Sequence, residues 1–374
     1  MNGLLRMRII ISVINDLVTD QRVNRIAGTL QANGHDVILV GRRLKNSLQV
    51  STRTYVTKRF RLLSSRSVIF YAEYNLRLLF FLLFHKSDLL IANDLDTLPA
   101  NYFASVIRRK KLMYDCHELF TEVPELIGRV FTRHFWIILE KLMLPRIKFS
   151  STVNNSIAEY YKDRYKIDMK IIRNLHYYRE VQHKIINKLS PENKKVILYQ
   201  GSVNRGRGVD LAIRAVKLIE NAVFVVIGDG DVLEEMKEIV KELQLANKVV
   251  FTGRIPFWEL HQYTIQADVG LVLEENLGLN YYYSLSNKLF DYIQARVPVL
   301  GSPFPEIMNI IENYGVGLIA DSHEIAEIAG KINCMLYDSE SRITWKNNLN
   351  IAAGELCWEK EEKVLLELIK TIQV

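Results

Sequence analysis

Residues 196–210 read VILYQGSVNRGRGVD, an apolar run followed by a glycine-rich loop with two arginines and then the start of a helical pattern. The run Val196–Gln200 is short, as in a buried strand, and apolar residues recur at helical spacing from Val209 to Ile219. A strand that leads through a tight loop into a helix is typical of a parallel sheet covered by helices. The same alternation extends outward from this stretch in both directions.

Apolar runs that predict further strands lie on both sides of it. In the second half of the chain they cover Val223–Gly228, Val249–Thr252, Val269–Leu273 and Pro298–Gly301. In the first half they cover Arg8–Ile14, Asp36–Gly41, Leu89–Ala92, Leu112–Asp115 and Ser150–Val153. Residues 173–195 interrupt the rhythm. We therefore predict an α/β protein with two doubly wound, Rossmann-like domains joined within that stretch.

Composition narrows the class of protein. With 374 residues, of which 49% are hydrophobic and 24% charged, the chain is expected to fold as two globular domains. Three cysteines at unrelated spacings predict neither a disulfide set nor a zinc site, which favours a reducing compartment. We expect no signal peptide and no membrane-spanning segment, and hence a cytoplasmic protein.

The net charge is +7, and it is unevenly distributed. Basic residues outnumber acidic ones in residues 1–180, whereas acidic residues are in excess from 181 to 374. A basic half predicts an anionic partner, such as a membrane surface, an acidic acceptor or a nucleic acid. Because no nucleic-acid-binding motif accompanies the charge, we expect no nucleic acid partner.

Ligands of open parallel sheets bind beyond the carboxyl ends of the strands, so the loops there are the candidate sites. The loop after Gln200 combines helix N-terminal N–H groups with guanidinium groups, which suits a diphosphate. It is neither a P-loop nor a dinucleotide fingerprint. The alternative is a plain turn with solvated arginines. The candidate residues of this loop are Gly201, Ser202, Arg205, Arg207 and Gly208.

Two later loops add weaker signals. Gly228 and Gly230 follow a strand, although Asp231 there is more simply a helix cap. Arg254 and Ile255 follow the next strand, where backbone groups are suited to reading the edge of a base.

The fourth signal is the sequence Ser286-Asn287-Lys288-Leu289-Phe290-Asp291-Tyr292. With Ser286 as N-cap, Lys288 lies in the first helical turn, where a cation is unfavourable unless an anion neutralises it. Lys288 and Asp291 share a helix face, which offers a cation for phosphate and a carboxylate for ribose. The alternative is an exposed salt bridge between the two.

This heptapeptide resembles the Pro-Asn-Lys-Leu-Phe-Glu-Tyr motif of retaining glycosyltransferases of the GT-B architecture, in family 4. The resemblance extends over nearly the whole chain and implies that Arg207 and Lys288 stabilise the departing diphosphate. It departs from the family at Tyr283, Asp291 and Arg296, where two glutamates and a glycine are usual. The implied donor-binding residues are Gly201, Ser202, Arg205, Gly208, Gly228, Gly230, Arg254, Ile255, Asn287, Leu289 and Asp291.

The first half also resembles this family. Asp20-Gln21-Arg22-Val23, Asp94-Leu95-Asp96 and the segment Tyr114–Phe120 are similar to its acceptor-side segments. The resemblance implies that His117 orients or polarises the acceptor hydroxyl, although a lone histidine is more often structural. Glu118 completes the acceptor-side set. The expected domains are residues 1–180 for the acceptor, 181–355 for the donor, and a terminal helix, 356–374, that returns to the first domain.

The resemblance implies transfer of a sugar from a nucleotide-diphosphate sugar to a hydroxyl with retention, without a metal or another cofactor. The acceptor is expected to be a lipid-linked saccharide of a bacterial surface polymer. The alternatives are a non-catalytic, sugar-nucleotide-binding partner subunit and a nucleotide-sugar epimerase. Basic residues near three phenylalanines suggest peripheral contact with an anionic membrane, the alternative being a solvated surface. These residues are Lys58, Arg59, Arg61, Arg66, the run Arg108–Lys111, Phe80, Phe81 and Phe84.

Overall fold

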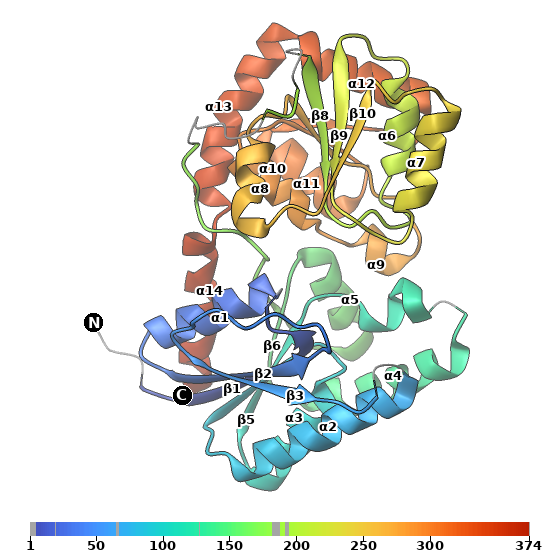
Figure 1. The fold of residues 1–374 in the computed structure, drawn as a ribbon. Coiled ribbons are helices and arrows are strands. Elements are labelled where there is room, and N and C mark those ends of the chain that lie inside the picture. Colours follow the sequence, from blue (N-terminus) through green and yellow to red (C-terminus); the bar gives the residue numbers. More distant parts are fainter. Residues whose placement is uncertain are drawn as a thin grey trace. The chain divides into compact units, whose positions relative to one another are not determined.

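The computed structural model describes residues 5–18, 20–64, 67–126, 128–181, 188–190 and 194–373. The chain divides into two compact units. Unit 1 contains Met1–Asn174 with Glu361–Val374, and unit 2 contains Leu175–Lys360. Each unit has a parallel sheet with helices packed on it (Figure 1). The predicted fold class, two doubly wound Rossmann-like domains, is confirmed.

Unit 1 is built on a seven-stranded parallel sheet in the order β3-β2-β1-β4-β5-β6-β7. Its chain order reverses between β1 and β4, so the carboxyl ends of these two strands form the switch point at which such sheets bind ligands. The strands are β1 (Arg8–Asp16), β2 (Asp36–Arg43), β3 (Val56–Arg61), β4 (Leu89–Asn93), β5 (Lys111–Cys116), β6 (Phe149–Thr152) and β7 (Lys170–Ile171).

Two helices of unit 1, α1 and α5, begin at side chains that cap them. Asp20 accepts from the backbone N–H of Val23 at 3.1 Å, and Asn154 accepts from that of Ile157 at 2.9 Å. The helices are α1 (Gln21–Ala32), α2 (Ser67–Phe84), α3 (Leu98–Arg108), α4 (Val130–Met143) and α5 (Asn155–Tyr165), with short 3-10 turns at Phe120–Glu122, Pro124–Leu126 and Leu144–Arg146.

Helix α14 (Trp358–Gln373) begins in unit 2, and its residues from Glu361 onward belong to unit 1. The Glu361 carboxylate pairs with the Arg173 guanidinium at 3.0 Å, and the Lys111 ammonium donates to the carbonyl of Ile372. Leu365 and Ile369 are fully buried. The last turns of the chain therefore complete the core of unit 1.

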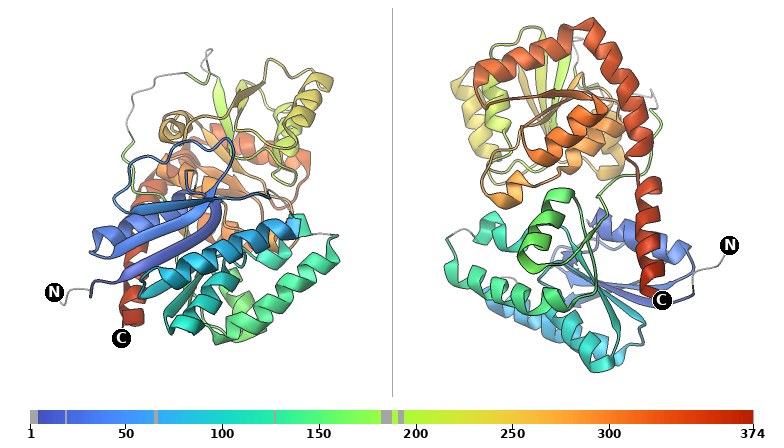
Figure 2. Two further views of the ribbon diagram at one scale, coloured as in Figure 1. Left: turned by 60° about the horizontal axis from the view of Figure 1, so that its bottom comes forward. Right: turned by 180° about the vertical axis from the view of Figure 1, so that it is seen from behind.

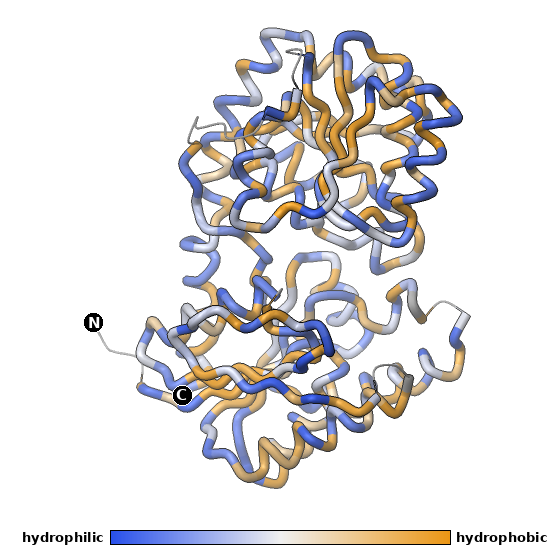
Figure 3. The backbone as a smooth tube through the Cα atoms, in the orientation of Figure 1, coloured by the Kyte–Doolittle hydropathy of each residue, from blue (hydrophilic) through white to orange (hydrophobic). Residues whose placement is uncertain are grey.

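Unit 2 has a six-stranded parallel sheet in the order β10-β9-β8-β11-β12-β13. Its switch point lies between β8 and β11. The strands are β8 (Lys195–Gln200), β9 (Ala222–Ile227), β10 (Val249–Gly253), β11 (Val269–Val272), β12 (Val299–Gly301) and β13 (Gly317–Ile319). Figure 3 shows its central strands in hydrophobic colours, as expected for a sheet buried on both faces.

The helices of unit 2 cover the two faces of this sheet (Figures 1 and 2). Those on one side include α6 and α7, and those on the other include α8, α10 and α11. Their bounds are α6 (Val209–Val216), α7 (Leu233–Glu242), α8 (Phe257–Thr264), α9 (Leu279–Tyr282), α10 (Asn287–Gln294), α11 (Pro305–Tyr314), α12 (Ile325–Tyr337) and α13 (Ser339–Glu355).

The predicted strands are present, with ends that differ by one or two residues, but β3, β7 and β13 were not predicted. Strand β3 contains Lys58, Arg59 and Arg61 because it lies at the sheet edge, where one side faces solvent. Strands β7 and β13 are two and three residues long, too short to leave a periodic pattern. Among the described helices, none has the length and apolar character needed to cross a bilayer.

Candidate functional site

Glycines allow the loops at the carboxyl edge of the unit 2 sheet to touch one another. The N–H of Gly228 donates to the carbonyl of Gly253 at 3.0 Å, and that of Gly201 donates to the carbonyl of Ile227 at 2.9 Å. A Cβ at Gly228 would lie 1.8 Å from the Gly201 oxygen, and its φ of +153° disfavours any other residue. At Gly208 a Cβ would lie 2.0 Å from the carbonyl oxygen of Leu273. These glycines are therefore required for loop packing, whatever the loops bind.

A buried cluster of three charged groups lies at this edge. The Glu274 carboxylate, which is 0% exposed, accepts from Lys288 Nζ at 2.5 Å and from Arg207 Nη1 at 2.8 Å. Each cation also lies over an aromatic ring: Lys288 Nζ is 5.2 Å from the ring centroid of Tyr199, and the Arg207 guanidinium is 4.7 Å from that of Tyr281. The structure thus brings together Arg207 and Lys288, two residues predicted to act on one diphosphate.

The electrostatics of this cluster follow from burial and pairing. Burial raises the pKa of Glu274, but Lys288 and Arg207 outweigh it, so the pKa is held below its usual range. Burial lowers the pKa of Lys288, and the nearby Arg207 guanidinium adds to this, while Glu274 opposes it. With all three groups ionised, the cluster carries one net positive charge, which suits an anionic ligand.

Asp291 does not form the salt bridge with Lys288 that was the alternative for this helix face. One carboxylate oxygen accepts from Gln200 Nε2 at 2.9 Å, and the other lies 3.0 Å from His176 Nε2. Burial raises the pKa of Asp291. His176 and the hydrogen bond from Gln200 lower this pKa by a larger amount, so the net shift is downward. Both oxygens expected to meet ribose hydroxyls are engaged within the unit.

The remaining predicted donor residues differ in accessibility. The guanidinium groups of Arg205 and Arg254 are 79% and 78% exposed, and Arg254 Nε donates to Asp229 at 3.1 Å. Ser202 and Asn287 are exposed, and Ile255 is half-buried. The side chain of Leu289 lies in the core, so only its backbone can meet a ligand.

Two of the residues that depart from the family motif, Arg296 and Tyr283, contact other residues of unit 2. Arg296 adopts a left-handed φ of +61°, a conformation that favours glycine, and its guanidinium donates to Asn350 Oδ1 at 3.0 Å. Tyr283 is the C-cap residue that follows α9, and its ring lies 5.4 Å from that of Tyr282. Both side chains thus have contacts within unit 2.

A second charged cluster lies in unit 1, where β4 and β5 end. His117 Nδ1 is 3.0 Å from Asp94 Oδ2, and its Nε2 is 2.9 Å from Asp115 Oδ2. Since ionised carboxylates only accept hydrogen bonds, both ring nitrogens donate and the imidazole is a cation. Burial lowers the pKa of His117, but the two carboxylates more than offset this and raise it to about 10.

Arg22 anchors the same cluster from α1. Its Nη2 donates to Asp115 Oδ1 at 2.8 Å, and its Nη1 donates to the carbonyl of Ile172 at 2.7 Å. Ser151 donates to the same carboxylate at 2.7 Å. Burial raises the pKa of Asp115, but Arg22 and His117 overcome it and hold the pKa far below its usual range. Asp115, which sequence reasoning did not single out, is the centre of this cluster.

The other acceptor-side candidates lie around it in different roles. Asp20 caps α1 and also accepts from Asn15. Asp96 is buried, and burial together with Asp94 and Glu118 raises the pKa of its carboxyl well above the usual range. Within the described ranges, no three acidic, histidine or cysteine side chains gather in a way that could hold a metal ion.

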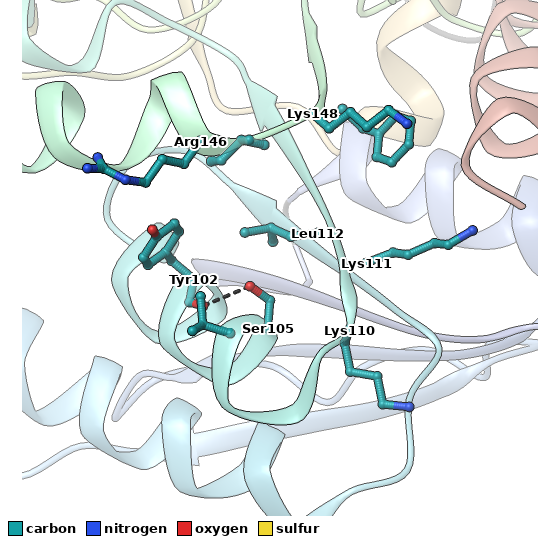
Figure 4. Close-up of a pocket in the computed structure, with 10 residues that line it drawn as sticks. Tyr102, Ser105, Lys110, Lys111, Leu112, Arg146 and Lys148 are labelled. Carbon is teal, nitrogen blue, oxygen red and sulfur yellow. Dashed lines mark hydrogen bonds between the residues drawn. The ribbon is translucent and has the colours of Figure 1, made fainter. Parts of the chain in front are cut away.

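A cavity of about 260 Å³ lies in unit 1 at the opposite edge of the sheet, where β5 and β6 begin. Figure 4 shows Lys110, Lys111, Arg146 and Lys148 around it, with Leu112 and the Ser105 side chain nearer its centre. It therefore lies away from His117 and its carboxylates, which follow the carboxyl ends of β4 and β5.

Comparisons with known proteins give the family of the chain. Residues 20–175 match the family described as Glycosyltransferase Family 4, and residues 181–350 match that described as Glycosyl transferases group 1. The chain is 32% identical to the probable glycosyltransferase WbjE of Pseudomonas aeruginosa over 132 residues. These aligned residues make up 34% of this chain and 32% of that protein. The chain thus spans about a third of that relative's length.

Solved structures are similar over almost the whole chain. Sucrose-phosphate synthase from Thermosynechococcus elongatus aligns with a TM-score of 0.79 at 18% identity, covering 98% of this chain and 99% of that one. HepE of Anabaena in complex with UDP-glucose aligns with a TM-score of 0.72 at 15% identity, covering 98% and 100%. Such identities establish the fold alone. Together with the two family matches, which cover most of the chain, they show that it belongs to the glycosyltransferases of the GT-B type, within family 4.

Proposed function

We propose that this glycosyltransferase moves a sugar from a nucleotide-diphosphate donor, bound in unit 2, to a hydroxyl of a lipid-linked saccharide, with retention. The observation that carries the proposal is the cluster of Arg207, Glu274 and Lys288 at the carboxyl edge of the unit 2 sheet. HepE, similar in fold, was solved with UDP-glucose, and the name WbjE denotes a probable glycosyltransferase. We place the reaction in the synthesis of a bacterial surface polysaccharide.

The chemistry requires stabilisation of a diphosphate on which negative charge builds as the glycosidic bond breaks. Arg207 and Lys288 supply two cations for that charge, so we propose that no metal takes part. The glycine-rich loop at Gly201 and the N-terminal turn of α10 add N–H groups to the same ligand. Retention follows if the acceptor hydroxyl attacks from the face that the diphosphate leaves, with a phosphate oxygen taking its proton.

In unit 1, the His117 imidazolium supports the acceptor side as a fixed positive charge. Both of its ring nitrogens are bonded to carboxylates, so we assign it an electrostatic and positioning role and not that of a base. Asp94 and Glu118 are the neighbouring acceptor-side candidates, with Asp96 buried beside them.

We propose that exposed apolar side chains of three helices form one face that contacts a lipid-linked acceptor. Helix α3 packs against α2 and α4, and all three expose large apolar side chains. Phe84 is 81% and Phe131 is 94% exposed. Exposed apolar side chains that gather on one surface mark a site of interaction. The set contains Leu76, Phe80 and Phe84 of α2, Phe103, Val106 and Ile107 of α3, and Phe131, Phe135, Ile138 and Leu142 of α4.

Basic side chains accompany this face, which favours an anionic lipid surface over a protein partner. Lys86 and Arg109 are exposed at the ends of α2 and α3, and the cavity in Figure 4, whose lining residues include Lys110 and Lys148, lies beside α3. The expected patch is revised in detail. Phe81 packs in the core and the Arg59 guanidinium is paired with Asp16 at 3.1 Å, whereas Arg66 lies outside the described residues.

The donor assignment is tested by titrating the purified protein with UDP-, GDP-, ADP- and TDP-sugars and following its thermal shift. We expect the sugars of one nucleotide to stabilise the protein. Lys288→Ala and Arg207→Ala should each weaken the apparent affinity for that nucleotide sugar at least tenfold. Hits indifferent to both substitutions would refute the donor site.

The reaction is then tested with that donor and lipid-linked acceptors, and the anomeric configuration of the product is read by NMR. An inverted product would refute retention, and binding without transfer would favour the non-catalytic partner subunit. Conversion of the donor without an acceptor would favour an epimerase.

Membrane contact is tested by sedimentation with vesicles of phosphatidylcholine, with or without phosphatidylglycerol. We expect binding only to the anionic vesicles, reduced by the double substitution Phe80→Ser and Phe84→Ser. A matched control replaces exposed Ile343 and Ile351 of α13 in unit 2 by serine. Equal binding by all proteins, or none by the unmodified protein, would refute the contact.

A further inference from the structure

We propose that Glu274 is a positioning residue that holds Arg207 and Lys288 together as one anion-binding unit. This inference rests on the proposed binding of a nucleotide diphosphate in unit 2. Each oxygen of the carboxylate is assigned to a different cation, at 2.5 Å and 2.8 Å, so the carboxylate sets the positions of both. Glu274 itself is fully buried.

The backbone of Glu274 is fixed as firmly as its side chain. Ser302 Oγ donates to its carbonyl at 2.7 Å, and His323 Nε2 lies 3.2 Å from the same oxygen. The preceding residue, Leu273, closes against Gly208, which ties the strand end to the glycine-rich loop that carries Arg207. The carboxylate therefore links two loops and the first turn of α10 at a single point.

Removing the negative charge would leave two cations close together in a buried site. An amide in its place offers one acceptor oxygen, while its NH₂ group would face the second cation. One cation would then lose its partner, and the buried Lys288 amine would release its proton more readily because the Arg207 charge opposes it. The neutral amine no longer attracts phosphate.

The other groups near Lys288 do not replace this effect. Tyr199, whose ring lies beneath the ammonium, has a pKa raised by burial, so it stays neutral across the neutral range. Asp291 favours the charged amine but is a lesser contributor than Glu274 and is engaged by His176 and Gln200. Tyr281 lies against Arg207.

The test is calorimetric titration with the nucleoside diphosphate identified in the panel, and with inorganic pyrophosphate, at pH 6, 7.5 and 9. For Glu274→Gln we expect at least a tenfold loss of affinity at pH 7.5 relative to the unmodified protein, with a loss that grows as pH rises. Titration of the probe's own phosphates is common to all proteins, so the ratio at each pH isolates the effect. A matched control, Glu234→Gln on the exposed face of α7, is expected to remain within twofold.

Glu274→Asp distinguishes the effect of the negative charge from that of side-chain length. It also keeps the proposal testable if Glu274→Gln does not fold. It keeps the negative charge but shortens the side chain, so we expect weaker binding with the pH dependence of the unmodified protein. Unchanged affinity in Glu274→Asp, or an affinity ratio for Glu274→Gln that does not vary with pH, would overturn the proposal. If the unmodified protein binds pyrophosphate but no nucleotide, the proposed function fails while the role of Glu274 is still measured. If it binds neither, both fail.

Discussion

Replacing His117 with glutamine removes a cation that sits between two carboxylates in unit 1. The ring is held by Asp94 and Asp115 at 3.0 Å and 2.9 Å, and its pKa is raised from 6.5 to about 10. A pKa raised by folding means that the folded state binds the proton more tightly than the unfolded state. The resulting stabilisation is complete below pH 6.5 and is lost as pH rises through 10.

The size of the effect follows from the two pKa values. At 1.36 kcal/mol for each unit of pKa, the protonated ring contributes up to about 5 kcal/mol below pH 6.5. The same relation gives about 3 kcal/mol at pH 8 and less than about 1 kcal/mol at pH 10. Because a domain is stable by roughly 5–15 kcal/mol in total, a loss of this size is readily measured.

Two measurements check this. Urea unfolding of the unmodified protein and of His117→Gln at pH 6, 8 and 10 should show a difference in free energy of unfolding that shrinks as pH rises. NMR of histidine labelled at Cε1 should show one resonance, absent from the variant, that titrates near pH 10. A His117 resonance that titrates near 6.5, or a difference in stability that is constant with pH, would refute the assignment of a fixed imidazolium.

Three further outcomes are expected. Gly228→Ala should destabilise unit 2 by at least about 3 kcal/mol in thermal or urea unfolding and abolish nucleotide binding, since its Cβ would meet the Gly201 oxygen at 1.8 Å. Gly330→Ala, whose Cβ meets nothing within 4 Å inside α12, should be neutral or stabilising by up to about 1 kcal/mol, and equal effects would contradict the packing argument. Asp291→Asn should lower the melting temperature of the free protein while changing nucleotide affinity less than threefold, because its oxygens are engaged by His176 and Gln200; a larger loss of affinity would assign it to the ribose. Ending the chain after Lys360 removes four buried aliphatic side chains (Leu365, Leu368, Ile369 and Ile372) at about 1.5–3 kcal/mol each, so limited proteolysis should degrade unit 1 and spare unit 2.

The alternation of apolar runs was sufficient to predict both sheets, because strands buried on two faces are apolar along their whole length. It failed at β3, where charges appear on an edge strand, and at the very short β7 and β13. The position of Lys288 in the first turn of α10 also follows from local sequence alone. Local signals of this kind need no knowledge of the partners across the fold.

The partners of the charged residues could not be predicted in this way. Arg22 and Asp115 are 93 positions apart, and Arg207 and Glu274 are 67 apart, so only the completed sheets bring them together. Glu274 and Glu275 are adjacent in the sequence, and the sequence does not indicate which of the two carboxylates becomes buried. For Asp291, the spacing of three residues allowed a salt bridge with Lys288. In the folded unit Lys288 pairs with Glu274, while Asp291 contacts His176 and Gln200.

Helix α14 has a consequence for the order in which the protein takes shape during synthesis. Unit 2 is continuous in the chain, so all of its residues are synthesised before residues 361–373. Unit 1, by contrast, is made first but waits for Leu365, Ile369 and Ile372 to fill its core. Domains that are synthesised first usually fold first. Here the first unit remains incomplete until its last residues, from Glu361 onward, are synthesised. The nascent first unit would thus expose part of its apolar core to chaperones until residues 361–373 have been synthesised and packed against it.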